Sequence, residues 1–175
     1  MTYQEVVAAY LKFGERIADM ADADLRGLID AMGRHPVLDR YDEIRIAHDA
    51  IALQLSLPGM RHERLRAINK TLMDELEGES NYRTPKRRYE ASPYAELLGD
   101  YASLAANLAA LCEDDEAAAV IAGWGGYEEF GPADESQLCH DCVCDTISAL
   151  RQQPGTEARV AKLKAADEAI IDTGF

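Results

Sequence analysis

The sequence has no lysine or arginine between Tyr89 and Leu150, a run of sixty-two residues. It also lacks a long apolar run, because its longest stretch without a charged residue, 101–112, has twelve residues, whereas a membrane-spanning helix needs about 20. The N-terminus has neither the positive charge nor the apolar segment of a signal peptide. We therefore expect a cytoplasmic protein whose cysteines are reduced thiols or metal ligands.

The sequence also lacks any pattern that predicts a β-strand. No segment shows the alternation of apolar and polar residues that predicts a β-strand. Apolar residues recur instead at three- and four-residue spacing, which is typical of amphipathic helices. Hydrophobic residues make up 47% of the chain and charged residues 29%, which is the balance of an ordinary globular protein. The sequence therefore predicts an all-α fold, a single-domain bundle of about seven or eight helices over residues 1–175.

Capping residues and helix breakers set the expected helix boundaries. A capping box begins the first helix at Thr2, and Asp22 or Asp24 is expected to cap a separate second helix that ends at Gly33. Further helices are expected at about 39–57, 61–77, 93–111, 115–122, 134–152 and 156–172. The helix at 39–57 is apolar on two opposite sides, which predicts a central position in the bundle.

Charge divides the chain into two parts. Residues 1–78 form a near-neutral helical half, 79–92 a basic linker loop, and 93–175 an acidic helical half. The net charge is −14, and residues 89–175 hold seventeen of the thirty-two carboxylates but only four of the eighteen basic residues. An anionic surface repels phosphate groups and acidic lipids. We therefore expect no direct contact of the acidic half with nucleic acid or membrane, and a cationic partner instead.

The sequence contains no catalytic signature. There is no phosphate-binding glycine loop, no EF-hand loop and no Glu-x-x-His pair of the di-iron kind. These absences favour a binding protein over an enzyme. The dipeptides His48-Asp49 and His140-Asp141 are similar to the ligand pair of HD-type phosphohydrolases, which are all-helical and metal-dependent. That resemblance implies a metal-dependent phosphohydrolase as one alternative function, with His48 as a ligand.

The cysteines suggest another alternative. Thiolate and imidazole are preferred zinc ligands, and Cys139 and Cys142, one helical turn apart, could share a zinc ion with Cys112 and His140. Structural zinc sites usually have two closely spaced pairs, and only one such pair is present. Cys144 points away from that pair, with His140 on its own side of the helix. The sequence therefore favours cysteines in the core and no cofactor, with a zinc-binding helical protein as the alternative.

The carboxylates of the acidic half lead to the main hypothesis. Like charges at helical spacing destabilise a helix, and helix N-termini explain only some of those present. The rest predict an interaction module that docks on a basic protein surface, and adaptation to high salt is the alternative explanation. One such partner is a nucleic-acid-binding protein, which this chain would inhibit by mimicking the nucleic acid. Phage or plasmid anti-defence proteins would act in this way. The expected partner-binding residues are Glu113, Asp114, Asp115, Glu116, Trp124, Tyr127, Glu128, Glu129, Phe130, Asp134, Glu135, Asp141 and Asp145.

Overall fold

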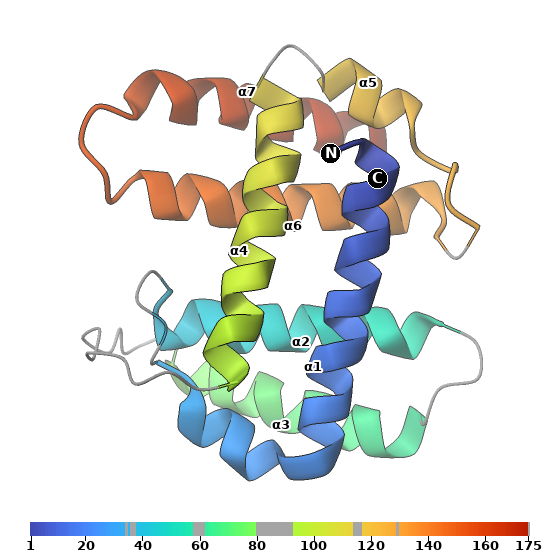
Figure 1. Cartoon of the computed structure of the whole chain (residues 1–175), viewed down its shortest axis with the longest axis vertical. Helices are drawn as coiled ribbons and strands as arrows, with labels where there is room; N and C mark the ends of the chain where they lie inside the picture. The colour runs from blue at the N-terminus through green and yellow to red at the C-terminus, as the bar shows by residue number, and fades with distance from the viewer. Residues whose placement is uncertain are drawn as a thin grey trace. The chain divides into compact units, whose positions relative to one another are not determined.

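The all-α prediction is confirmed by a computed structural model, which describes residues 1–33, 35, 38–57, 62–79, 93–113, 117–128 and 130–174. These residues form seven α-helices and no strand (Figure 1). The helices are α1 (Tyr3–Ala31), α2 (Arg40–Ser56), α3 (His62–Glu79), α4 (Pro93–Leu111), α5 (Ala117–Ala122), α6 (Pro132–Leu150) and α7 (Glu157–Gly174). Most of the expected boundaries therefore lie within two or three residues of the observed ones.

The structure contradicts the prediction of two separate helices before Gly33. The expected break near Asp22 is absent, and α1 continues for 29 residues. The Arg64 guanidinium on α3 explains this continuity, because its Nε lies 2.7 Å from Asp22 Oδ1 and its Nη2 also donates to the Asp22 carbonyl. Asp22 is thus held by a neighbouring helix instead of ending one helix and starting the next.

Contacts divide the chain into two compact units. Unit 1 comprises residues 1–10 and 101–175, and unit 2 comprises residues 11–100. The division differs from the expected halves, because the first ten residues belong with the acidic part and the start of α4 belongs with the neutral part. Of the expected basic linker at 79–92, residues 80–92 lie outside the described part of the chain.

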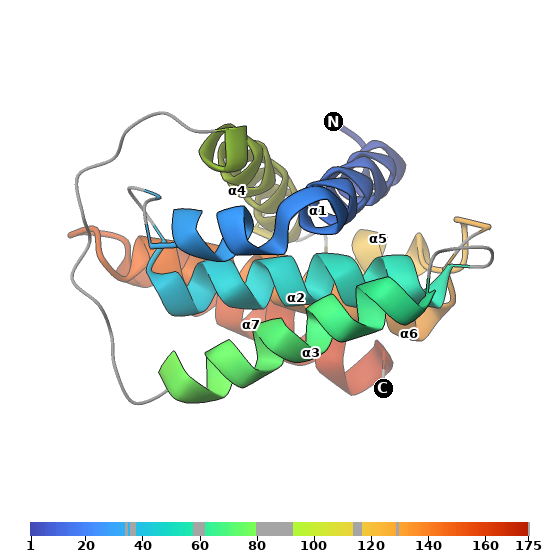
Figure 2. The same ribbon diagram turned by 90° about the horizontal axis from the view of Figure 1, so that it is seen from below.

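Helix α2 is the central helix of unit 2, as its two apolar sides predicted. Asp39 and Asp42 form a capping box at its start. Figure 2 shows α2 between α1 and α3. On one side, α1 approaches so closely at Gly14 that an added Cβ would lie 3.0 Å from the Gln54 amide. On the other side, His48 Nδ1 lies 2.6 Å from Asn69 Oδ1 on α3.

Unit 1 is built around the hairpin of α6 and α7. The turn between the two helices contains Gly155, whose φ of +79° suits glycine. Helix α5 packs against α7, and Leu163 and Ile170 anchor α7 in the interior with no exposed surface. Tyr10 and Tyr101 pack with ring centroids 5.7 Å apart, which joins the N-terminal residues to this unit.

No helix in the described ranges combines the length and the apolar character needed to cross a bilayer.

Candidate functional site

Three carboxylates that were expected on the binding surface lie in the interior. Glu135, Asp141 and Asp145 on α6 are 0%, 8% and 5% exposed. The Tyr101 hydroxyl donates to Asp145 Oδ2 at 2.6 Å, and the Gln137 amide donates to Asp141 Oδ1 at 2.9 Å. Because polar partners compensate for the lost hydration, these carboxylates can be buried. The expectation that they line an exposed acidic face is therefore corrected.

Glu135 has the most enclosed position of the three. Its Oε2 accepts hydrogen bonds from the Tyr3 hydroxyl at 3.2 Å and from the Gly125 N–H at 2.9 Å. Burial, and to a smaller extent Cys139 and Glu135, raises the pKa of Tyr3 well above its ordinary value. The Tyr3 hydroxyl therefore keeps its proton at neutral pH and donates a hydrogen bond to the Glu135 carboxylate.

Three of the four cysteines are core residues, which agrees with the interpretation favoured by the sequence. Cys112, Cys139 and Cys142 are buried, and all four cysteines are thiols without disulfides. Burial raises the pKa of Cys112 to about 11 and that of Cys139 to about 12, and it raises the pKa of Cys142 well above its ordinary value. Thiols with raised pKa values are poor nucleophiles, because the thiolate is the reactive form.

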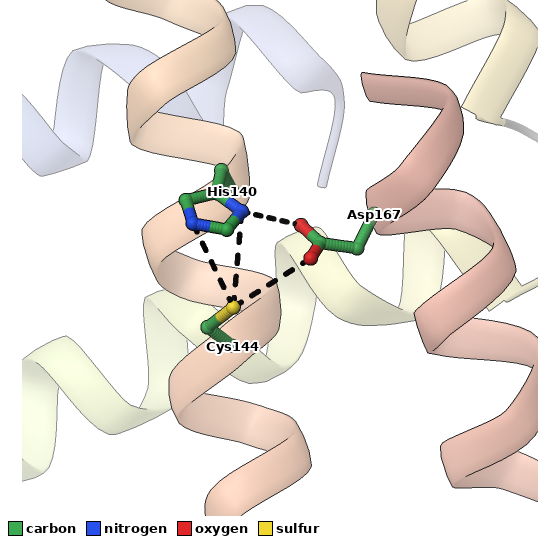
Figure 3. A group of neighbouring side chains, drawn as sticks. All are labelled: His140, Cys144 and Asp167. Carbon is green, nitrogen blue, oxygen red and sulfur yellow. Dashed lines mark hydrogen bonds and ion pairs between the residues drawn. The ribbon is translucent and has the colours of Figure 1, made fainter. Parts of the chain in front are cut away.

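One group of potential metal ligands stands out, and it is not the predicted one. His140, Cys144 and Asp167 offer ligand atoms that all lie within 4.8 Å of one another (Figure 3), and no other such group occurs in the described part of the chain. The group includes His140 but none of the expected partners Cys112, Cys139 and Cys142. The geometry therefore does not support the predicted zinc site, although it brings His140 close to Cys144.

The contacts within this group are direct. His140 Nδ1 lies 2.7 Å from Asp167 Oδ1, and the Cys144 thiol lies 3.6 Å from Asp167 Oδ2. Helix α6 supplies His140 and Cys144 at four-residue spacing, which places both on one face, and α7 supplies Asp167. The side chains of His140 and Asp167 are 28% and 14% exposed. The group is therefore semi-enclosed and within reach of solvent.

The same three residue types occur in cysteine nucleophile triads, but the geometry here differs. The Cys144 sulfur is 3.7 Å from His140 Nδ1 and 3.9 Å from Nε2. The sulfur is therefore almost equally distant from both ring nitrogens, whereas a thiol hydrogen-bonded to one nitrogen lies much nearer that atom. A general base needs a directed hydrogen bond to its nucleophile. The group therefore lacks the directed sulfur–nitrogen hydrogen bond of such triads.

The loop between α5 and α6, called the aromatic loop for Trp124, Tyr127 and Phe130, packs within unit 1. Phe130 is buried, and its ring centroid is 5.8 Å from that of Tyr127. Trp124 is half-buried, and it lies so close to Gly174 at the end of α7 that a Cβ added there would be 3.2 Å from the indole. Phe130 thus contributes to the core, while Trp124 and Tyr127 remain partly accessible to a partner.

Two of the expected surface carboxylates are exposed, and a third is half-buried. Glu128 and Asp134 are exposed, and Asp134 Oδ2 accepts a hydrogen bond from the Gly131 N–H at 3.1 Å. Glu113 is half-buried and lies 2.7 Å from the Arg159 guanidinium. The other expected residues, Asp114, Asp115, Glu116 and Glu129, lie outside the described ranges.

The phosphohydrolase alternative receives no support from the histidines. His48 lies against Asn69 on α3, and its Nε2 is 3.8 Å from Asp49 Oδ1. No group of three potential ligands within the described ranges contains His48. In the second dipeptide, His140 pairs with Asp167, while Asp141 is buried beside Gln137.

Two residues of these sites were missed by sequence reasoning, Tyr3 and Asp167. Asp167 lies about as far after the Pro154-Gly155 turn as Cys142 lies before it, and an antiparallel hairpin places such positions opposite each other. Hairpin register could therefore have identified Asp167. No local pattern marks Tyr3, whose partner Glu135 is 132 residues away.

Comparisons with protein-family models, curated proteins and solved structures found no match to this chain.

Proposed function

We propose that this protein is a cytoplasmic helical interaction module whose acidic surface, carried mainly by unit 1, binds a basic surface of a partner protein. The observation that carries the proposal is the set of exposed carboxylates of unit 1 that have no ion-pair partner among the described residues. They are Glu5, Glu128, Asp134, Glu157, Glu168 and Asp172.

Unit 2 provides an internal comparison. Among its described residues, ion pairs with lysine or arginine at nitrogen–oxygen distances between 2.6 and 3.1 Å include Arg16–Asp100, Arg40–Glu75, Arg64–Asp22 and Lys70–Asp74. In unit 1, the corresponding contact in the described ranges is Arg159–Glu113. The difference reflects composition, since Arg151, Arg159, Lys162 and Lys164 are the basic residues of unit 1.

The basic residues of unit 1 are also unevenly placed. Arg151 and Lys164 line the same groove beside the turn between α6 and α7. Glu128 and Asp134, near the aromatic loop, form no ion pair within the described structure. An uncompensated negative surface attracts cationic partners and speeds their association, and this effect weakens as salt is added.

Nucleic-acid-binding proteins are the partner class that fits this chemistry best. Their binding surfaces carry arginine and lysine positioned to neutralise phosphates. A folded surface of carboxylates can occupy such a site and exclude the nucleic acid. The module would then act as a binding inhibitor and not as an enzyme. Trp124 and Tyr127, partly exposed next to Glu128, would supply apolar contacts of the kind found at interface hot spots.

The test is affinity capture from a host lysate at low and high salt, with partners identified by mass spectrometry and then purified. The expected partner is basic, releases its nucleic acid on binding this protein, and binds less tightly to the triple variant Glu128→Lys, Glu168→Lys, Asp172→Lys. The matched control reverses three exposed carboxylates of unit 2, Glu15, Glu77 and Glu96.

Equal loss of binding in both triple variants would indicate a general charge effect and contradict a specific surface on unit 1. Binding that is unaffected by salt and by the reversal in unit 1 would overturn the proposal.

A further inference from the structure

We infer that His140, Cys144 and Asp167 form a binding site for a zinc-class divalent cation, with three protein ligands and one open coordination position. The site is distinct from the proposed acidic docking surface, because it uses a thiol and an imidazole between α6 and α7 (Figure 3). The two proposals can therefore fail independently.

The two helices that carry the site are held in place by packing. Helices α6 and α7 make the most extensive helix–helix contact of unit 1. On α6, Val143 and Ile147 are buried next to Cys144, and on α7, Ala166 is buried next to Asp167. Because the neighbouring residues are fixed in the interior, the three ligand side chains start from backbone positions that packing determines. Ligands held on rigid helices lose little conformational entropy on binding a metal.

The distances between ligand atoms are close to those of a tetrahedral site. A zinc ion bound by nitrogen, sulfur and oxygen at normal bond lengths separates its ligand atoms by about 3.5 Å. The Cys144 sulfur lies 3.7 Å from His140 Nδ1 and 3.6 Å from Asp167 Oδ2. His140 Nδ1 and Asp167 Oδ1 share a hydrogen bond at 2.7 Å, so these two atoms must move apart for a metal ion to bind between them. An increase of under about 1 Å in this distance makes room for a metal ion in place of the hydrogen-bonding proton.

The ligand types select the class of ion. Calcium and magnesium prefer oxygen ligands only, whereas thiolate, imidazole and carboxylate together suit zinc and cobalt. Three protein ligands leave one tetrahedral position for water or for a ligand from another molecule. The partial exposure of His140 and Asp167 gives the ion and that fourth ligand a path to the site.

The competing interpretation is a structural contact in which His140 and Asp167 simply hydrogen-bond across the hairpin. Such a contact would stabilise the packing of α6 on α7 without any contribution from the thiol. The two interpretations differ in what Cys144 does, because only a metal site requires its sulfur. The decisive observation is therefore spectroscopic and reports on the sulfur.

The experiment is titration of the reduced, metal-free protein with cobalt(II). We expect a near-ultraviolet charge-transfer band from thiolate to cobalt, visible bands of a tetrahedral ion, saturation at one equivalent, and loss of the colour when zinc is added. The substitutions His140→Ala, Cys144→Ser and Asp167→Asn should each weaken cobalt binding by at least about tenfold. Circular dichroism of each variant separates ligand loss from unfolding.

Two matched controls test the assignment. His48→Ala removes another half-buried histidine, and Asp172→Asn removes an exposed carboxylate on the same helix as Asp167. Both should bind cobalt as the unsubstituted protein does. Absence of the thiolate band would overturn the proposed site. Persistence of the band in Cys144→Ser would also overturn it, because the band would then come from a buried cysteine.

Discussion

The buried Glu135 depends on the Tyr3 hydroxyl, which lies 132 residues away in the sequence. Removing the Tyr3 donor leaves the carboxylate with one fewer hydrogen bond in an enclosed position. We expect Tyr3→Phe to lower the free energy of unfolding by about 1–3 kcal/mol. Urea denaturation followed by circular dichroism measures the change, and Tyr127→Phe in the same unit is the control. Equal stability of the two variants would contradict the role of the Tyr3 hydroxyl.

The four thiols should differ in reactivity. Cys112, Cys139 and Cys142 are buried, whereas Cys144 is half-exposed. We expect iodoacetamide at neutral pH to modify Cys144 first in the folded protein and the other three only after unfolding, because alkylation requires an accessible thiolate. Mass spectrometry of the modified peptides tests this order. Rapid modification of Cys139 under native conditions would show that its enclosure is incomplete.

Stability should also depend on pH in the alkaline range. Burial raises the pKa of Cys112 to about 11 and that of Cys139 to about 12, while an unfolded thiol has a pKa of about 8.5. The folded state therefore retains protons that the unfolded state loses. Stability from this source is complete below about pH 8 and decreases above it, by about 1–2 kcal/mol for each thiol at pH 10.

Urea denaturation at a series of pH values between neutrality and pH 10 measures this decrease. Cys112→Ala should reduce the slope by removing one of the titrating thiols. A free energy of unfolding that stays constant through the alkaline range would contradict the assignment.

Helix α1 offers a direct test of why the predicted break is absent. If Asp22 capped a second helix, Ala23 would be its first residue, a position that favours proline. In the continuous α1, Ala23 is an interior position, so Ala23→Pro should destabilise the protein by about 3 kcal/mol or more. Glu157→Pro, at the first position of α7, is the control and should have little effect. A small effect of Ala23→Pro, measured by thermal unfolding, would indicate two helices.

Local signals predicted most of the helices but not their interior contacts. The start of α2 at Asp39 and the proline at the start of α4 are signals within one helical turn, so the sequence alone reveals them. The break near Asp22 was wrong because Arg64, forty-two residues away, binds the Asp22 carbonyl. Likewise, carboxylates such as Asp145 resembled surface residues because their hydroxyl partners are distant in sequence.

The net charge of −14 should weaken the folded state at low ionic strength. Repulsion among unpaired carboxylates acts over about 30 Å in 0.01 M salt and about 3 Å in 1 M salt. We therefore expect the melting temperature to rise by a few degrees as sodium chloride is added. The triple reversal Glu128→Lys, Glu168→Lys, Asp172→Lys should reduce this rise. A melting temperature that falls as salt is added would contradict the charge argument.

The division into units also has a consequence for synthesis on the ribosome. Unit 2 is continuous in the chain and has all of its residues once residue 100 has been added, whereas unit 1 combines residues 1–10 with residues 101–175. Tyr3 is synthesised 132 residues before Glu135, its hydrogen-bond partner. We therefore expect unit 2 to fold during translation, and unit 1 to fold late, through contacts of high sequence separation that are slow to form.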